Sequence, residues 1–449
     1  MKGFIMTNIQ NYDDALAFIH GRTKFKKIPT LKRMRRFLQE LGNPQENLDY
    51  LHITGTNGKG STTAMLRSML MADGLSVGTF TSPFIVRFNE RISLNGQPIP
   101  DDELVKTVQK VAPIVDYLDE VLPEGGPTEF EIDTAIMFTW FAKMRPDVVI
   151  LEVGIGGLFD STNVIVPKVS GIVSVGYDHM HVLGDTLGEI AAQKAGIIKP
   201  KVPVVIGRLP KAARQVIIEA AQDKQAPLYE NGRQFTAKKL NDHQLKNEIE
   251  YDGLMIRRQR FQLGLLGEYQ VDNAAVAITM AQLYLKQQGL PIDVGSFRQG
   301  LADTRWPGRL EVVNDSPLVV LDGAHNLPGM QALTTTIKDD FKNMEIYVLV
   351  AILADKQYQL MLGEIASLPN VHLMLTNFAG PGPKRPSADL KKAAQDIETR
   401  WPIKTAASWQ EGLLKISKEA SADDAILITG SLYFISEVRS FFVNSAAEN

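Results

Sequence analysis

Residues 51–61 read Leu-His-Ile-Thr-Gly-Thr-Asn-Gly-Lys-Gly-Ser, an apolar strand that runs into a glycine-rich turn. The glycines free backbone N–H groups, and a helix predicted to start near Thr62 points its N-terminus at the same turn; both features suit a polyanion. Lys59 would place a positive charge near β- and γ-phosphates, and Ser61 a hydroxyl within reach of Mg²⁺, as in a P-loop. The stretch therefore predicts a phosphate-binding loop.

The loop departs from the usual P-loop spacing, because a glycine separates the lysine from the serine and only two residues separate the first two glycines. The alternative is an ordinary solvent-exposed turn between a strand and a helix. Such turns seldom combine three glycines, a lysine and three hydroxyl residues directly after a buried strand. The following helix also fits phosphate binding, since its apolar residues at helical spacing over 65–70 end at Asp73-Gly74.

The composition excludes several kinds of site. With 449 residues, 44% of them apolar, the chain can bury more than one core, and its length suggests roughly two to three domains. A net charge of −3 and an isoelectric point near 6.2 give no electrostatic case for nucleic-acid binding. The absence of cysteine excludes disulfides, thiolate nucleophiles and cysteine-bound metals, which leaves oxygen and imidazole ligands suited to Mg²⁺.

The sequence also predicts where the protein resides. No apolar run approaches the roughly 18 residues of a membrane-spanning helix, and residues 1–10 lack the apolar core of a signal peptide. We expect a cytoplasmic protein that binds neither membranes nor nucleic acid.

Apolar strands alternate with helical patterns through the first half of the chain. After the first strand, buried strands are predicted at residues 75–80, 147–151, 169–175 and 202–206. This alternation is typical of an α/β fold with a parallel sheet covered by helices on both faces. Such sheets bind ligands at the carboxyl ends of their strands. The motifs that lie there are the glycine loop, Thr81-Ser82-Pro83, Glu152 and Asp178-His179.

A second strand–helix alternation occupies the last third of the chain. Its predicted strands cover residues 317–321, 344–353, 371–376 and 424–429. Before it come a polar segment at 230–260, which suggests hairpins, and a predicted helix at 269–288. Proline and glycine break regular structure around Trp306, so we place the domain boundary there. The predicted domains are residues 1–305, with the phosphate loop, and residues 306–449, a smaller Rossmann-like domain.

Glu152 ends a predicted buried strand and is a candidate ligand for the metal of a nucleotide. The strand delivers the carboxylate to the edge of the sheet where the glycine loop opens. The alternative is a strand-end glutamate that faces solvent. The glycines at 154, 156 and 157 favour the first interpretation, because they allow a ligand to approach the backbone closely.

His179 lies just beyond another apolar strand, and a neutral imidazole can join oxygen ligands on a divalent cation. A lone histidine is more often structural. Its neighbourhood favours a ligand, since Thr186 and Glu189 have the spacing of a capping box that opens a helix carrying Lys194.

These motifs resemble those of the folylpolyglutamate synthase family, the dihydrofolate synthase-like branch of the Mur ligase superfamily, over nearly all of the chain. In order, they are His52-Ile-Thr-Gly-Thr-Asn-Gly-Lys-Gly-Ser61, Thr81-Ser-Pro83, Asn89-Glu-Arg-Ile92, Thr128-Glu-Phe-Glu131, Leu151-Glu-Val-Gly-Ile-Gly-Gly157, Asp160-Ser-Thr-Asn163, Asp178-His179, Gln193-Lys-Ala-Gly-Ile-Ile-Lys199, Trp306-Pro-Gly-Arg309 and Asp322-Gly-Ala-His-Asn326.

The resemblance implies a site for ATP and Mg²⁺. The residues that match the family's phosphate-binding loop are Asn57, Gly58, Lys59, Gly60 and Ser61. Across the cleft between the domains, the matches to residues that hold ATP are Asn273, Arg309 and Asp322. The implied metal ligands are Ser61, Ser82, Glu152, His179 and Lys194.

Lys194 matches a lysine that the family carries with an N6-carboxylated side chain. An unmodified ammonium group would repel Mg²⁺ and Lys59, whereas a carbamate offers negative charge and oxygen ligands. The alternative, which the residues alone favour, is a solvated lysine on a helix surface.

The resemblance also implies sites for two small-molecule substrates, a reduced folate and L-glutamate. The residues that match the folate pocket are Ser82, Pro83, Thr128, Glu129 and Phe130, of which Phe130 would stack on the pterin ring. Those linked to the incoming glutamate are His325 and Ser431, and Asp355-Lys356 is a further candidate for the cleft. Each could instead cap its strand or pair with a surface charge. Two departures from the family are Phe84, where a histidine is expected, and Leu158-Phe159, where a basic residue is frequent.

The implied reaction is the ATP-dependent ligation of L-glutamate to a folate carboxylate. The γ-phosphoryl group first moves to the carboxylate, the glutamate amine attacks the acyl phosphate, and ADP and phosphate leave. Lys59, Lys194 and His325 are the implied catalytic residues, and a monomer is the family default. The acceptor is tetrahydrofolate or its polyglutamates, with dihydropteroate left open.

Three other functions compete with this one. A peptidoglycan ligase of the Mur type shares the mechanism but ordinarily carries a UDP-binding domain before the loop, and only about fifty residues precede Gly55. A nucleotide-dependent switch has no need of a second Rossmann-like domain lined with ligands. A small-molecule kinase would stop at phosphoryl transfer. Glutamate-dependent release of ADP with a folate acceptor separates all three from the ligase.

Overall fold

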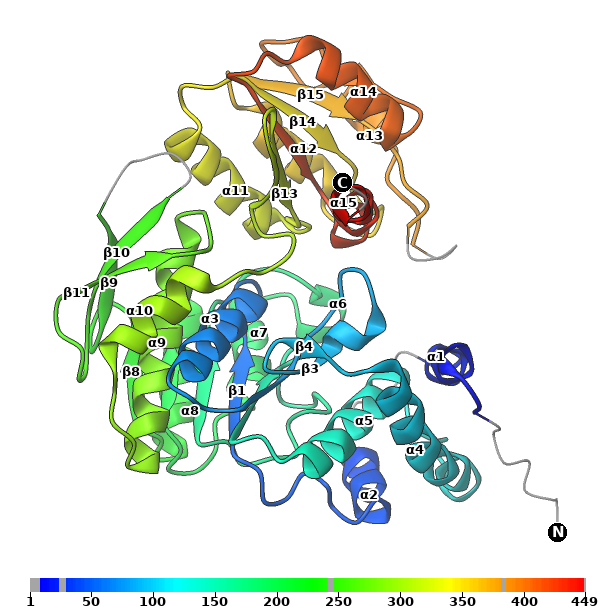
Figure 1. Cartoon of the computed structure of the whole chain (residues 1–449), viewed down its shortest axis with the longest axis vertical. Coiled ribbons are helices and arrows are strands. Elements are labelled where there is room, and N and C mark those ends of the chain that lie inside the picture. The colour runs from blue at the N-terminus through cyan, green and yellow to red at the C-terminus, as the bar shows by residue number, and fades with distance from the viewer. Residues whose placement is uncertain (1–8, 24–29, 241–245, 381–384, 448–449) are drawn as a thin grey trace. The chain divides into compact units, whose positions relative to one another are not determined.

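The computed structural model describes residues 9–23, 30–240, 246–380 and 385–447, and it divides the chain into two compact units (Figure 1). The first comprises Met1–Val175, His179–Phe235 and Val276–Gly300. The second comprises Gly176–Asp178, Thr236–Ala275 and Leu301–Asn449. The boundary proposed near Trp306 lies close to the last of these transitions and stays a prediction. Unlike the predicted domain, the second unit also includes Thr236–Ala275.

An eight-stranded sheet forms the centre of the first unit, in the order β4-β3-β2-β5-β1-β6-β7-β8. Its strands are β1 Tyr50–Thr54, β2 Val77–Phe80, β3 Ile92–Leu94, β4 Gln97–Pro98, β5 Val148–Glu152, β6 Val169–Ile172, β7 Val204–Ile206 and β8 Leu228–Glu230. In sheet order, the strands β2, β5, β1, β6, β7 and β8 are parallel, as the sequence predicts. The apolar runs of β1 and β5 are buried at every position, which is typical of strands covered on both faces.

The edge beyond β2 is antiparallel, and the sequence analysis did not predict it. β3 pairs with β2 and β4 with β3. Asn95 and Gly96 connect β3 to β4 with φ of +52° and +76°, the left-handed pair of a tight hairpin turn. The fold is therefore α/β with a parallel core and an antiparallel edge.

Helices cover both faces of this sheet. They are α1 Tyr12–His20, α2 Lys32–Glu40, α3 Lys59–Ala72, α4 Asp101–Val121, α5 Glu129–Met144, α6 Met180–Leu183, α7 Leu187–Ala195 and α8 Lys211–Asp223, with a 3-10 turn at Phe88–Arg91. The helices α9 Tyr269–Gln288 and α10 Val294–Asp303 each contribute to both units. The bounds of α9 are those predicted from the sequence. On opposite faces of the sheet, Phe138 of α5 contacts Tyr50, and Met280 of α9 lies against Gly171.

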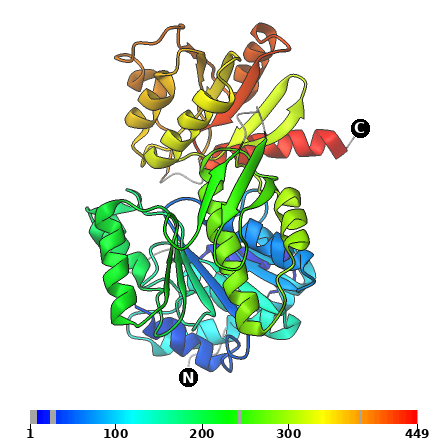
Figure 2. The same ribbon diagram turned by 90° about the vertical axis from the view of Figure 1, so that its left-hand side faces the viewer.

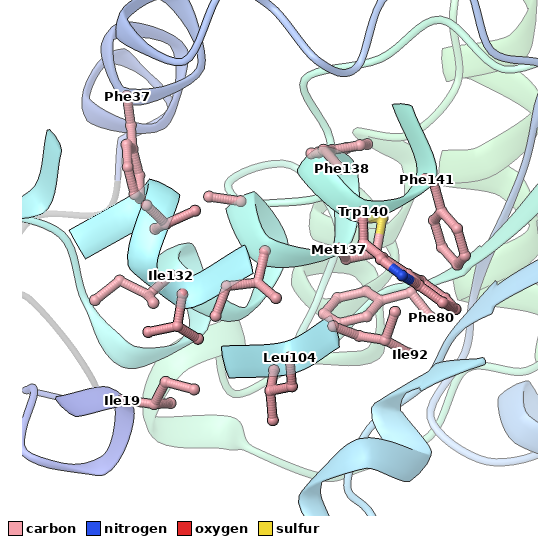
Figure 3. Packing of buried hydrophobic residues seen from close by; sticks show 14 of the residues in the cluster. Ile19, Phe37, Phe80, Ile92, Leu104, Ile132, Met137, Phe138, Trp140 and Phe141 are labelled. Atoms are coloured by element: carbon pink, nitrogen blue, oxygen red, sulfur yellow. The ribbon is translucent and has the colours of Figure 1, made fainter. Parts of the chain in front are cut away.

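One core cluster of the first unit lies between α1, α2, α4, α5 and the sheet (Figure 3). Phe141 of α5 packs so closely on β2 that a Cβ atom at Gly78 would lie 2.9 Å from its ring. Full burial of such an aromatic side chain stabilises the fold by about 1.5–3 kcal/mol. A second cluster lies under α7 and α8, and it anchors the helix that carries Lys194.

The second unit has a six-stranded sheet in the order β12-β13-β17-β14-β15-β16, in which only β12 is antiparallel to its neighbour. Its strands are β12 Glu311–Asp315, β13 Leu318–Asp322, β14 Ile346–Val350, β15 Val371–Leu375, β16 Lys404–Thr405 and β17 Ala425–Thr429. Its helices are α11 Leu327–Asp340, α12 Tyr358–Ala366, α13 Leu390–Ala393, α14 Trp409–Glu419 and α15 Leu432–Ala447. The parallel strands β13, β14, β15 and β17 confirm the predicted second alternation.

A separate three-stranded antiparallel sheet precedes this alternation and is visible in the turned view (Figure 2). Its strands are β9 Thr236–Lys239, β10 Asn247–Asp252 and β11 Gln259–Leu263, where the sequence suggests hairpins. An ion pair of 2.5 Å between Lys239 and Asp340 ties β9 to α11. Among the described residues, no helix combines the length and apolarity needed to cross a membrane.

Candidate active site

The glycine loop after β1 enters α3 through a left-handed residue. Gly58 precedes α3 at φ +83°, a conformation that strongly favours glycine. Because this turn carries the chain directly into the helix, α3 begins at Lys59 and not near Thr62 as predicted. The first turn of α3 has N–H groups without helical acceptors. The loop and the helix N-terminus therefore form an arrangement suited to a polyanion.

Ser174, just after β6, holds this loop in place, and the sequence analysis missed it. Its hydroxyl donates to the carbonyl oxygen of Asn57 at 2.8 Å and accepts from the Asn57 N–H at 2.9 Å. Its carbonyl oxygen accepts from the Thr56 N–H at 3.1 Å. A polar residue directly after a buried strand was the available signal.

Lys59 and Ser61 occupy the first turn of α3. The Lys59 ammonium donates to the carbonyl oxygen of Gly55 at 2.9 Å, so that the side chain lies over its own loop. Ser61 is 2% exposed. Lys59 thus lies over the loop and Ser61 is buried beside it in the sequence, and their contacts with phosphate and metal stay predictions.

Glu152 and Lys194 are both buried, with exposed fractions of 4% and 2%. Glu152 ends β5 and pairs in register with Ile53 of β1, two residues before Gly55. The alternative interpretation of Glu152 as a strand-end glutamate that faces solvent is therefore wrong. Lys194 lies in the last turn of α7, whose capping box of Thr186 and Glu189 is present as predicted. The alternative of a solvated lysine is wrong as well.

The remaining predicted metal ligands, Ser82 and His179, follow β2 and β6. Ser82 is partly exposed in the loop after β2, and His179 precedes α6 in a left-handed conformation at φ +49°. All five predicted ligands belong to the first unit. The described residues contain no cluster of three His, Cys, Asp or Glu that could hold a metal, and the predicted set contains only two residues of these types. Metal ligation stays a prediction.

The predicted folate residues lie at the start of α5. Thr128 caps this helix, since its hydroxyl accepts from the Glu131 N–H and the Glu131 carboxylate accepts from the Thr128 N–H at 2.8 Å. Glu129 is 8% exposed and contacts His20 Nδ1 at 3.0 Å. The Phe130 ring lies 5.7 Å from that of Phe80. Sequence reasoning gave no role to His20, because only tertiary packing brings it to Glu129.

Phe84, which departs from the family pattern, belongs to a cationic aromatic cluster. The Arg91 guanidinium lies 5.3 Å from the ring centroid of Phe84 and 5.9 Å from that of Phe88. Such contacts are worth about 0.5–2 kcal/mol. The loop that carries Ser82 and the exposed Pro83 is therefore supported by packing rather than by a polar contact at position 84.

In the second unit, Asp322 organises the connection between α10 and β13. Its carboxylate accepts from the N–H groups of Leu310 at 3.0 Å and Ala324 at 2.9 Å. Burial raises its pKa, and nearby Arg309 opposes this rise. Arg309 passes so close to Gly323 that a Cβ atom there would lie 2.4 Å from Nη1. Arg309 and Asp322 are thus neighbours.

Asn273 lies on α9, is 5% exposed and donates to the Gln270 side chain at 2.8 Å. It belongs to the second unit, together with Arg309 and Asp322. The ATP contacts assigned to these three residues stay predictions.

His325 and Ser431, the predicted glutamate contacts, follow β13 and β17. His325 Nδ1 lies 2.8 Å from the carbonyl oxygen of Gly323, which can only accept, so Nδ1 carries the proton. Burial, followed by the charge of Lys356, lowers the pKa of His325 to about 4. Ser431 is 1% exposed, and its hydroxyl has no hydrogen-bond partner among the described residues.

The candidates Asp355 and Lys356 differ in their surroundings. Asp355 pairs with Arg385 at 2.8 Å on the surface, which is the alternative foreseen for it. Lys356 pairs with Asp178 at 3.0 Å, and Asp178 also accepts from Asn326. Of the two, Lys356 is the one held among the predicted site residues of the second unit.

Comparisons with known proteins show the family of this chain. Residues 53–281 match the Mur ligase middle domain, and residues 308–432 match the Mur ligase glutamate ligase domain. The chain is 41% identical over 436 residues to the dihydrofolate synthase/folylpolyglutamate synthase of Bacillus subtilis, covering 95% of this chain and 98% of the relative.

Solved structures give the same result. The apo form of L. casei folylpolyglutamate synthase matches with a TM-score of 0.85 and 37% identity, over 97% of this chain and 100% of that one. A complex of a folylpolyglutamate synthase with AMPPCP and folate matches with a TM-score of 0.83 and 38% identity, over 96% and 99%. From the loop geometry and these similarities together, the chain belongs to the folylpolyglutamate synthase/dihydrofolate synthase family of the Mur ligase superfamily.

Proposed function

We propose that this protein uses ATP to join L-glutamate to a carboxylate of a reduced folate, with ADP and phosphate as products. The observation that carries the proposal is the left-handed Gly58 that opens α3 behind β1, in a chain matching both Mur ligase domains. The relative from Bacillus subtilis bears the activity in its name, and a similar structure holds an ATP analogue together with folate.

The chemistry requires activation, because a carboxylate does not accept an amine at neutral pH. Transfer of the γ-phosphoryl group gives an acyl phosphate, and attack of the glutamate amine expels phosphate. The protein mainly positions the reactants and neutralises charge. In this proposal Asn57, the N–H groups of Gly58 and Gly60, and the Lys59 ammonium bind the phosphates. Asn273, Arg309 and Asp322 hold the nucleotide.

Mg²⁺ would offset the charge that develops as the phosphoryl group moves. The residues proposed to hold it are Ser61, Ser82, Glu152, His179 and Lys194. Their hydroxyl, carboxylate and imidazole groups suit a hard cation. The burial of the Glu152 carboxylate supports this set, because a nearby dication would favour the charged form of a buried carboxylate.

We include N6-carboxylation of Lys194 in the proposal. A buried ammonium beside a dication is unfavourable, whereas a carbamate would supply oxygen donors. Carbon-13 NMR of the protein incubated with labelled bicarbonate tests this directly. A carbamate resonance present in the wild type and absent in Lys194→Arg supports the modification, and its absence from both removes it.

The folate is proposed to contact Ser82, Pro83, Thr128, Glu129 and Phe130, and the glutamate His325 and Ser431. His325 stays neutral near pH 7 because its pKa is about 4. With the proton on Nδ1, its Nε2 offers a lone pair to the incoming amine. The buried Ser431 hydroxyl has no partner among the described residues, so it is available to a ligand.

The deciding experiment incubates the protein with ATP, Mg²⁺ and labelled glutamate, with tetrahydrofolate or dihydropteroate in separate reactions. The proposal expects glutamate-dependent ADP release and, by mass spectrometry, a product extended by glutamate. Activity with dihydropteroate would establish the second acceptor. ADP release that needs no glutamate would instead support a kinase, and no ADP release with either acceptor overturns the proposal.

The cytoplasmic location and the monomeric state belong to the same proposal, and light scattering tests the monomeric state.

A further inference from the structure

A buried hydrogen-bond chain joins the central strand β1 to the glycine-rich segment after β5. His52 of β1 has no exposed surface, and its Nε2 lies 2.8 Å from the hydroxyl oxygen of Thr162. That hydroxyl donates its single proton to Oδ1 of Asp160. It therefore accepts from His52, so the His52 proton lies on Nε2.

Asp160 in turn gathers the backbone of the glycine-rich segment. Its Oδ2 accepts from the N–H groups of Gly154 at 3.0 Å and Ile155 at 3.1 Å, and its Oδ1 accepts from the Thr162 N–H at 3.0 Å. Asp160 and Thr162 are 8% and 0% exposed. One carboxylate thus clamps both arms of the loop, and the hydroxyl of Thr162 holds that carboxylate.

The clamped segment lies directly between two of the proposed metal ligands. Glu152 is two residues upstream of Gly154 in the chain. At the other end, the Leu158 N–H donates to the carbonyl oxygen of Gln193 at 2.7 Å. A Cβ atom at Gly157 would lie 3.1 Å from the carbonyl oxygen of Lys194. The loop is therefore the spacer that separates the end of β5 from the end of α7.

We propose that His52, acting through Thr162 and Asp160, is a positioning residue of the ligase that fixes the 154–157 backbone and thereby the separation of Glu152 from Lys194. The inference rests on the proposed roles of these two residues. Since partners that orient metal ligands typically change activity about 10- to 100-fold when removed, the effect should appear in kcat.

Burial lowers the pKa of His52 to about 3, so the ring remains neutral at physiological pH. A neutral donor can orient the hydroxyl without bringing a buried positive charge close to the metal site. This property distinguishes His52 from an arginine or lysine, which would hold Asp160 through an ion pair. The positioning chain is accordingly independent of pH over the neutral range.

The geometry suggests a matched pair of variants. In His52→Gln, the amide nitrogen is as many bonds from the backbone as Nε2 and can still donate to Thr162. In His52→Asn, the amide nitrogen corresponds to Nδ1 and falls short. Both variants are polar and lose ring volume, so they differ mainly in reach. The inference expects His52→Gln to keep kcat within about threefold and His52→Asn to lose about 10- to 100-fold.

Thr162→Ser and Thr162→Val form a second pair, in which only the serine keeps the hydroxyl. Thr107→Val is the control, because the buried Thr107 hydroxyl also makes a hydrogen bond, to the Glu103 carbonyl oxygen at 2.7 Å, but in α4. The second readout is hydrogen exchange of the Gly154 and Ile155 amides without nucleotide. In Thr162→Val, the two amides should lose their protection, and kcat should fall at least about tenfold with little change in KM for glutamate. Thr162→Ser and Thr107→Val should keep both the protection and kcat.

Equal kcat in His52→Gln and His52→Asn, or undiminished protection in Thr162→Val, would overturn the inference. An equal loss of kcat in Thr107→Val and Thr162→Val would also overturn the inference. The loss would then be explained by a general decrease in stability. The exchange measurement decides the clamp even if the wild type proves not to release ADP. Failure of the proposed function and failure of the clamp are therefore distinguishable.

Discussion

Arg33 Nε donates to Glu131 Oε2 at 2.8 Å, and the two side chains are only 5% and 4% exposed. This buried ion pair joins α2 to the N-terminus of α5, where Thr128 also uses the Glu131 carboxylate. Removing one partner leaves the other charge buried without compensation, which costs about 3–5 kcal/mol. We therefore expect Arg33→Met to lower the free energy of unfolding in urea by this amount.

The control for this prediction is the pair of Arg36 and Glu40, which lies on the surface of the same helix. Arg36→Met should cost less than about 1 kcal/mol, because solvent screens exposed pairs. Similar losses in both variants would contradict the importance assigned to burial.

Lys59→Ala should lower kcat about 10²–10³-fold, because the ammonium would no longer offset charge on the transferred phosphoryl group. The control is Lys211→Ala, since Lys211 is exposed and likewise begins a helix, α8. Steady-state ADP release measures both variants. Undiminished turnover in Lys59→Ala would exclude the lysine from the catalytic step.

Gly58→Ala should destabilise the fold by about 1–2 kcal/mol, because alanine is strained in the left-handed conformation. Gly42→Ala is the matched control, with φ +79° and open space around the added methyl group. Both variants should lose similar stability in urea. Only Gly58→Ala should also weaken AMPPCP binding in calorimetry, and equal binding in the two variants would argue against the loop as the nucleotide site.

Lys194→Ala should nearly abolish turnover while the protein stays folded. The prediction follows from the burial of Lys194 and its proposed role as a carbamate ligand of the metal. Circular dichroism checks the fold, and ADP release checks turnover. Full activity in this variant would remove the carbamate from the mechanism.

The lowered pKa values of His52 and His325 predict a loss of stability in acid. Burial lowers the pKa of His52 to about 3 and that of His325 to about 4, from an ordinary value of 6.5. Below pH 6.5 the unfolded chain therefore binds protons that the folded chain does not, and stability falls as pH falls. From pH 6.5 to 5 each histidine accounts for up to about 2 kcal/mol.

Urea unfolding at pH 7 and pH 5 measures this loss. His52→Gln lacks the titrating ring and should show a smaller loss between the two pH values than the wild type. An identical loss in variant and wild type would contradict the assignment to His52.

The sequence predicted those parts of the fold that local patterns determine. The buried strands beside the glycine loop and the helix α9 were found because their apolar periods extend over whole elements. The strands β3 and β4 were missed, because three and two residues are too few to display an alternation. The start of α3 was misplaced because the left-handed turn at Gly58 replaces the usual approach to a helix.

Side chains contributed from distant segments could not be predicted in the same way. Ser174 meets Asn57 across 117 residues, His20 meets Glu129 across 109 and Arg33 meets Glu131 across 98. Such partners are selected by tertiary packing, which leaves no local periodicity. The family resemblance supplied the proposed roles of Lys194 and His325, and the structure adds the burial of Lys194.

The two-residue strand β4 also has a consequence for the solubility of the protein. It ends the eight-stranded sheet at Gln97 and Pro98, both exposed, and proline has no N–H to donate. A second chain that approached this edge could form very few backbone hydrogen bonds with it. The β3–β4 hairpin therefore protects this edge of the sheet, whose inner strands are strongly apolar, against edge-to-edge association with another chain.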